Sequence, residues 1–68
     1  MDELSALPDP DLRRYLDEAM VRRTEAESEP LRSIAGRQCL AAIAELRRRG
    51  LPLPAAAARI EKQVDTSA

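Results

Sequence analysis

The chain has 68 residues, enough for one small domain, and its eleven basic and twelve acidic residues give a net charge of −1. It contains no Phe, no Trp and a single Tyr, Tyr15, so any core must be aliphatic. A chain of this length buries only about 60% of its unfolded surface, and we expect self-association or a partner protein to complete its stability. The balanced charge argues against a dedicated nucleic-acid binder, which usually shows a basic excess on one face.

Several classes of function lack the residues that they need. The sequence has no His, the commonest general base and metal ligand, and its two glycines, Gly36 and Gly50, form no phosphate-binding loop. We therefore expect a protein that is not an enzyme and that has no cofactor, metal or small-molecule substrate. One Cys excludes an internal disulfide and fits a reducing compartment.

The location of the protein also follows from composition. No apolar run approaches the roughly 18 residues of a membrane span, and the acidic N-terminus MDELSALPDPD is unlike a signal peptide. We expect a cytoplasmic protein without membrane association. The excess of Arg over Lys, the abundant Ala and the absence of Asn indicate a GC-rich, bacterial genome.

The first predicted helix spans residues 10–26. Asp9 is a suitable N-cap and Pro10 fits the first helical position. Apolar side chains recur at helical spacing and predict one buried stripe, formed by Leu12, Tyr15, Leu16, Ala19 and Met20. Residues 24–29, TEAESE, hold no large apolar side chain and predict a break before Pro30; one long helix kinked at Pro30 is the alternative.

The second predicted helix, residues 29–49, is the most apolar part of the chain. Its main apolar face holds Leu31, Ile34, Ala35, Cys39, Ala42, Ile43 and Leu46, and Leu40, Ala41 and Ala44 widen that face. A helix this apolar contacts more than one neighbour. The interior Gly36 costs about 1 kcal/mol relative to Ala, and a close helix crossing would explain it. Cys39 has apolar neighbours and is expected to be a small buried residue.

The second helix is expected to end at Gly50, a residue suited to a left-handed C-cap. Arg47, Arg48 and Arg49 in its last turn complement the negative end of the helix dipole; a patch for phosphate or an acidic partner is the alternative. Residues 51–54, LPLP, predict a stiff extended turn, because residues before Pro avoid the α region. A short third helix over residues 54–64 follows, and residues 1–6 and 65–68 are expected to be flexible.

These elements predict an all-α fold, a small three-helix domain in which a helical hairpin precedes a short C-terminal helix. Residues 46–60, LRRRGLPLPAAAARI, resemble the opening of the recombinase and resolvase type of helix-turn-helix, which implies DNA binding. A DNA-reading helix over residues 54–64 would present side chains without hydrogen-bonding groups, at Pro54, Ala55, Ala56 and Ala58. A later start, after Glu61, leaves too few residues for a helix. We interpret the segment as a helical corner.

The leading functional prediction is a small non-catalytic interaction protein, a regulator, adaptor or co-chaperone, that docks helix to helix on a protein partner or a second copy. The expected interface consists of Leu12, Tyr15, Leu16, Ala35, Cys39, Leu40, Ala42, Ile43 and Leu46. The alternative is that these side chains form the intramolecular core. Antiparallel self-pairing of the second helix is one form of the prediction, and it uses Ala35, Cys39, Ala42 and Leu46.

Two other functions stay open at this stage. One is a DNA-binding or nucleic-acid-associated regulator, whose contacts would be Arg37, Arg47, Arg48 and Arg49. Its binding would weaken steeply with salt, because neutralised phosphates release counterions. The other is a small structural subunit of a larger complex.

Overall fold

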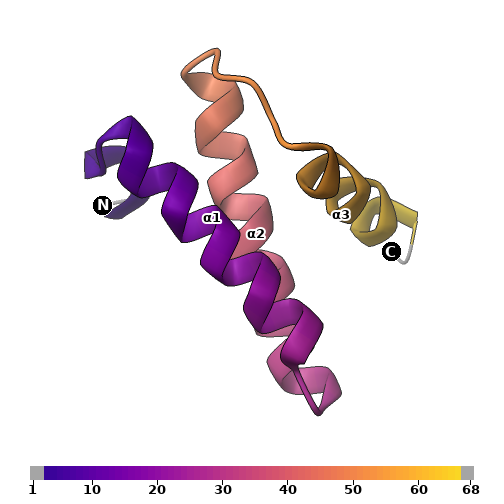
Figure 1. Ribbon diagram of the computed structural model, residues 1–68. Helices are drawn as coiled ribbons and strands as arrows, with labels where there is room; N and C mark the ends of the chain where they lie inside the picture. Colours follow the sequence, from indigo (N-terminus) through magenta and orange to yellow (C-terminus); the bar gives the residue numbers. More distant parts are fainter. Residues whose placement is uncertain (1–2, 67–68) are drawn as a thin grey trace.

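The computed structural model describes residues 3–66, with side chains up to Gln63, and shows three α-helices after a short 3-10 helix (Figure 1). The 3-10 helix η1 spans Glu3–Ala6, α1 spans Asp9–Glu25, α2 spans Glu29–Arg48 and α3 spans Ala55–Thr66. The described residues include no strand. The predicted all-α class, with a helical hairpin followed by a shorter helix, is confirmed.

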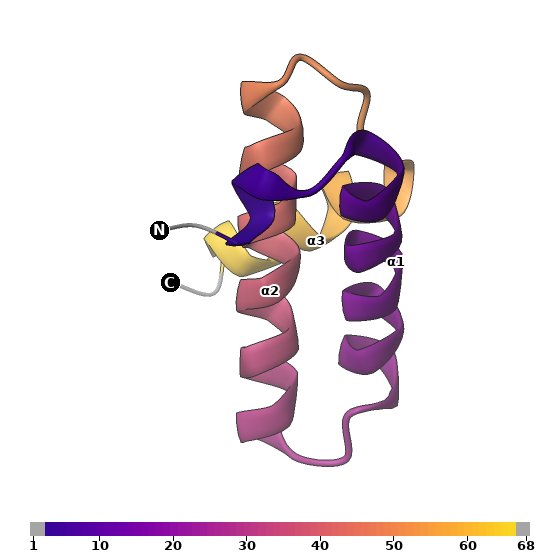
Figure 2. The ribbon, with the colours of Figure 1, turned by 90° about the vertical axis from the view of Figure 1, so that its left-hand side faces the viewer.

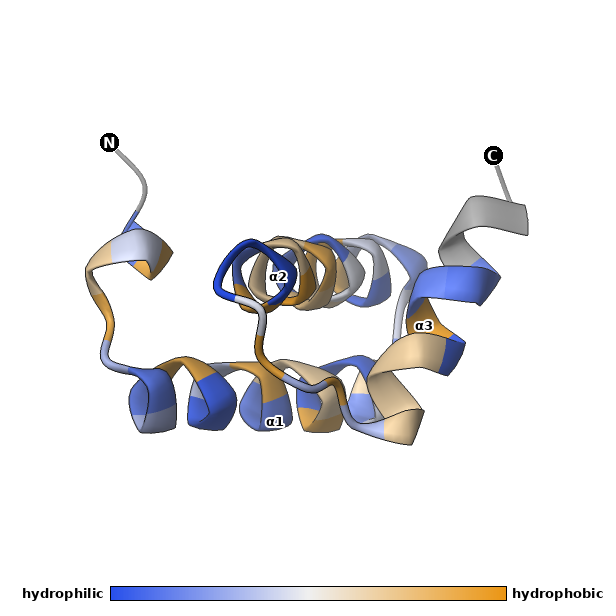
Figure 3. Cartoon of the chain, turned by 90° about the horizontal axis from the view of Figure 1, so that it is seen from above, coloured by the Kyte–Doolittle hydropathy of each residue, from blue (hydrophilic) through white to orange (hydrophobic). Residues whose placement is uncertain are grey.

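α1 and α2 run antiparallel and form the hairpin at the centre of the molecule (Figure 2). The chain leaves helical structure at residues 26–28, so α1 and α2 are two helices and not one kinked helix. Seen from above in Figure 3, η1 and α3 lie on opposite flanks of α2. Each flank of α2 is therefore covered by a different short element, and only over part of its length.

An aliphatic core fills the space between the helices. The hairpin supplies most of its buried side chains, which are Leu12, Leu16, Ala19, Ala35, Cys39, Ala42, Ile43 and Leu46. α3 adds Ala57 and Ile60, and η1 adds Leu4. Tyr15, Met20 and Leu40 are half-buried and pack against the edge of this core. The helical spacing of the apolar residues thus identified most of the core of the hairpin.

The predicted partner interface is wrong for most of its residues, because they are buried in this core. The side chains of Leu12, Leu16, Ala35, Cys39, Ala42, Ile43 and Leu46 are at most 3% exposed. They have no surface to offer a partner, because α1 and α2 bury them against each other. Antiparallel self-pairing of α2 through Ala35, Cys39, Ala42 and Leu46 would require the hairpin to open. Of the predicted interface, Tyr15 and Leu40 alone are partly accessible.

The start of the chain is more ordered than predicted. Residues 1–6 were expected to be flexible, but Glu3–Ala6 form η1 and Leu4 is buried in the core. Periodicity could not reveal this, because one apolar side chain in a four-residue helix makes no pattern. At the other end α3 continues to Thr66, past the predicted end at residue 64. Residues 1–2 and 67–68 lie outside the described residues.

The two predicted helix caps have different outcomes. Gly50 has φ of 71° after the last turn of α2, and the N–H of Leu51 donates to the carbonyl oxygen of Leu46 at 3.0 Å, so the predicted left-handed C-cap is confirmed. Asp9 is not the N-cap of α1. That position belongs to Pro8, without a side-chain capping bond, and the Asp9 carboxylate accepts instead from Arg49.

Candidate interaction surfaces

Glu45 is a buried charged residue in the last turns of α2, with 4% of its surface exposed. Arg48 donates from Nε to Oε1 at 3.1 Å and from Nη2 to Oε2, and Arg49 donates from Nε to Oε2 at 2.8 Å. The hydrogen bonds from Arg48 and then Arg49 hold the pKa of the Glu45 carboxyl below its ordinary value, although burial opposes them. The Glu45 carboxylate therefore has a structural role, which the sequence signalled only by its spacing from two arginines.

The arginines of RRRG are bound by groups of the same chain. Arg49 also donates from Nη1 to Oδ1 of Asp9 at 2.8 Å, and its bonds to Glu45 and Asp9 raise the pKa of its guanidinium. Arg47 Nη2 lies 2.5 Å from Oε1 of Glu61 in α3. Each of the three cations thus faces a carboxylate, which leaves little uncompensated charge for the predicted nucleic-acid contact at Arg47, Arg48 and Arg49.

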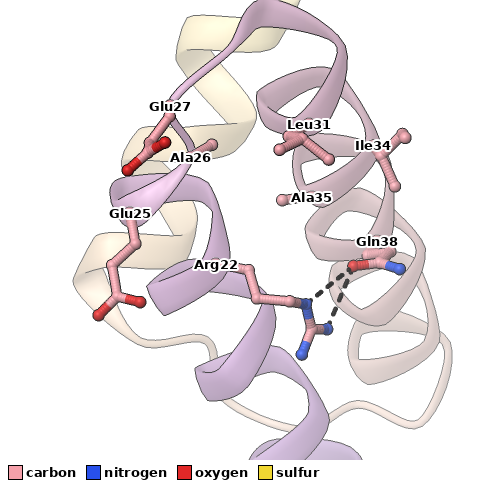
Figure 4. Close-up of a pocket in the computed structure, with 8 residues that line it drawn as sticks. All are labelled: Arg22, Glu25, Ala26, Glu27, Leu31, Ile34, Ala35 and Gln38. Carbon is pink, nitrogen blue, oxygen red and sulfur yellow. Dashed lines mark hydrogen bonds between the residues drawn. The ribbon is translucent and has the colours of Figure 1, made fainter.

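An apolar hollow of about 400 Å³ lies where α1 passes into α2 (Figure 4). We call it the hairpin-end groove; its lining residues are Arg22, Glu25, Ala26, Glu27, Leu31, Ile34, Ala35 and Gln38. Leu31 and Ile34 were predicted on the buried face of the second helix but are 56% and 50% exposed. Both lie near the start of α2, whereas η1 packs near the other end of that helix, where Arg49 donates to the carbonyl oxygen of Leu4.

The rim of the hairpin-end groove is acidic. Arg22 donates from Nε and Nη2 to Oε1 of Gln38, at 3.3 and 3.1 Å, and so links α1 to α2 across the groove (Figure 4). The carboxylates of Glu25 and Glu27 make no hydrogen bond or ion pair among the described side chains of residues 3–63. Val21, 53% exposed, extends the apolar surface along α1 beside Arg22. The groove therefore combines exposed aliphatic side chains with a net charge of −1, because the carboxylates of Glu25 and Glu27 outnumber the one guanidinium of Arg22.

A second hollow, of about 260 Å³, lies on the α3 side of α2. We call it the cationic groove; its lining residues are Arg23, Glu29, Arg32, Ser33, Gly36, Arg37 and Leu40. Arg37 and Leu40 were candidate contact residues in the sequence. In the structure they line the same hollow as Arg32, earlier in α2, and Arg23 of α1. Arg23 donates to Oε1 of Gln63 in α3 at 3.3 Å. The sequence could not show this cluster, because helical spacing does not relate α1 to α2.

The expected close helix crossing at Gly36 is absent. A Cβ atom built on Gly36 would meet only Nε of Arg23, at 3.8 Å, which is an ordinary contact. Cys39, by contrast, is the small buried residue that was predicted, and burial raises the pKa of its thiol although Arg23 and Arg22 lower it. The Cys39 thiol is thus neither accessible nor readily ionised.

Comparison of the chain with family models, curated proteins and solved structures found no match. Within residues 3–66 no helix has the length and apolar character to cross a bilayer, and among the described side chains, up to Gln63, no acidic or Cys cluster is arranged to hold a metal ion. The hairpin-end groove and the cationic groove are two hollows of the described chain that combine exposed apolar or charged side chains with open space.

Proposed function

We propose that the protein is a small interaction module that binds an amphipathic helix of a partner protein in the hairpin-end groove. The observation that carries the proposal is the exposure of Leu31 and Ile34 at the wall of a largely apolar hollow. Burying apolar surface is favourable by about 25 cal/mol per Å². Exposed apolar patches with polar rims are typical of protein-binding sites on soluble domains.

Charge specifies the partner further. Glu25 and Glu27 stand at the rim of the groove without an ion pair, and their two negative charges outnumber the one positive charge of Arg22, whose guanidinium is bound to the neutral amide of Gln38. A matching helix would place aliphatic anchors at i, i+3 or i+4 against Leu31 and Ile34. It would also carry Lys or Arg beside that apolar stripe, facing the two glutamates.

The exposed apolar area at the hairpin-end groove is small, which limits the expected affinity for a partner. Among the described residues, the exposed large apolar side chains are Val21, Leu31 and Ile34. Standard stable interfaces bury about 800 Å² per partner, far more than these side chains can supply. We therefore expect reversible, micromolar binding, which suits a regulator or adaptor better than a permanent structural subunit.

The proposal can be tested with a display library of helical peptides that share an aliphatic i, i+3, i+4, i+7 stripe and differ in flanking charge. We expect enrichment of Lys- and Arg-flanked peptides, and NMR shifts on binding at Leu31, Ile34 and Gln38. Ile34→Asp should weaken binding at least tenfold without loss of helicity. Ala44→Asp is the matched control, because Ala44 is exposed on α2 but lines neither groove; its binding should be unchanged.

Three outcomes would contradict the proposal. Enrichment of peptides without basic flanks would show that the rim charges do not select the partner. NMR shifts centred away from the groove would show that the partner binds elsewhere. Sedimentation of the protein alone over a wide concentration range provides the other check. A dimer that Ile34→Asp disrupts and Ala44→Asp leaves intact would make a second copy the occupant in place of a different protein.

A further inference from the structure

We propose that the cationic groove is a binding site for a phosphate monoester group. Three guanidinium groups, those of Arg23, Arg32 and Arg37, line one hollow together with the single carboxylate of Glu29. Three positive charges less one negative charge leave a local charge of +2. A phosphate monoester carries about −1.5 to −2 at neutral pH and would balance that charge. The site is separate from the hairpin-end groove and does not depend on it.

The donors of this groove are largely unused. Arg37 makes no side-chain hydrogen bond or ion pair with the side chains that the structure describes, those of residues 3–63. Arg32 meets Glu29 through Nη1 alone, at 3.4 Å on the exposed surface, and Arg23 uses Nη2 for Gln63. Since a guanidinium has five N–H donors, most remain available, in contrast to the paired arginines of RRRG. Guanidinium groups bind phosphate oxygens through paired, charge-assisted hydrogen bonds, which makes Arg the residue suited to such a group.

Gly36 keeps the cationic groove open. Gly is the least favourable residue in a helix interior after Pro, and packing does not require it here, because an added Cβ would touch only Nε of Arg23 at 3.8 Å. Without a side chain at this position, α2 leaves space beside the Arg23 guanidinium. Ser33 lies in the same lining and adds a hydroxyl donor. The groove thus combines cations, a hydroxyl group and free space.

The extent of the positive charge favours one phosphate group over a polyanion. Nucleic acids are bound along a track of cations that neutralises several phosphates. Here three cations gather in one hollow, the acidic residues Glu25 at the end of α1 and Glu27 in the turn interrupt the positive charge before α2, and Arg47 is paired with Glu61. The phosphate would be carried either by a free small molecule or by a phosphorylated side chain of a protein.

The test is an NMR titration of the full chain at fixed ionic strength, with inorganic phosphate and with a capped phosphoserine peptide as probes. We expect saturable shifts at the amides of Ser33, Gly36 and Arg37. Arg32→Gln and Arg37→Gln should each weaken binding about tenfold. Arg14→Gln, at an exposed position of α1 outside the lining of the groove, should leave it unchanged. Circular dichroism of each variant confirms that it is folded.

The two probes also identify the source of the phosphate. Equal affinity for both would support a free phosphate compound, and several-fold tighter binding of the peptide would support a phosphorylated protein. Shifts that do not saturate, or an equal loss of binding in Arg14→Gln, would reveal general charge screening and overturn the proposal. Saturable shifts confined to residues 45–50 would place the phosphate elsewhere and overturn it as well.

Discussion

Nε of Arg49 donates to Oε2 of Glu45 at 2.8 Å, one helical turn earlier, and the two side chains are only 18% and 4% exposed. The same guanidinium reaches Oδ1 of Asp9 at 2.8 Å and the carbonyl oxygen of Leu4 at 3.0 Å. One arginine at the end of α2 therefore holds both η1 and the start of α1. Arg47, two residues earlier, makes one ion pair to Glu61 with 57% of its own side chain exposed.

This difference predicts unequal effects of the same substitution at two neighbouring arginines. Arg49→Gln should lower the Tm by about 10 °C, because it leaves the buried Glu45 with one partner fewer and releases η1. Arg47→Gln should lower the Tm by less than about 4 °C, since exposed ion pairs contribute little. Thermal melting followed by circular dichroism measures both. Similar losses in the two variants would show that Arg49 has no special structural role.

The lowered pKa of the Glu45 carboxyl predicts acid sensitivity. In the unfolded chain this group regains its ordinary pKa of 4.5, so the folded state binds the proton less readily than the unfolded state does. Its contribution to stability is complete above about pH 4.5 and is lost as the pH falls through the lower pKa of the folded state. Between about pH 6 and 3, the Tm of the wild type should fall more steeply than that of Glu45→Gln. Parallel curves would assign the acid sensitivity to other carboxylates.

Substitution by Ala should change the free energy of unfolding in opposite directions at Gly36 and Gly50. Gly36→Ala should stabilise the fold by about 0.5 to 1 kcal/mol, because Ala is the better helix former and its Cβ meets only Nε of Arg23 at 3.8 Å. Gly50→Ala should destabilise it by about 1 kcal/mol, because φ of 71° is strained for a residue with a Cβ. Urea denaturation gives both free energies of unfolding. A destabilised Gly36→Ala variant would mean that α1 and α2 approach more closely than the structure shows.

The same Leu→Ala substitution should reduce stability in the core, at Leu4, but not in the hairpin-end groove, at Leu31. Leu4→Ala should reduce the free energy of unfolding by about 2 kcal/mol, since Leu4 is 6% exposed and packs into the core. Leu31→Ala should change it by less than about 0.5 kcal/mol, because Leu31 is 56% exposed. Denaturation of the two variants under one set of conditions compares them directly. A small loss for Leu4→Ala would show that η1 contributes little to stability.

The sequence by itself determined the helical class and the apolar interior of the hairpin. The spacing of Leu12 and Leu16, and of Ile43 and Leu46, is a local property that a helix converts directly into one buried face. The end of α2 at Gly50 was equally local, because the left-handed conformation there suits the residue that lacks a Cβ.

Tertiary structure alone decided which parts of each face are covered. Helical spacing places Leu31 and Ile34 near the core stripe, but both are exposed and neither packs against the core. The cationic groove likewise needed the alignment of α1 with α2, which brings Arg23 beside Arg32 and Arg37. Periodicity specifies the direction of a side chain around its own helix. Contacts between separate helices depend on their lengths and relative alignment, which packing of the whole chain determines.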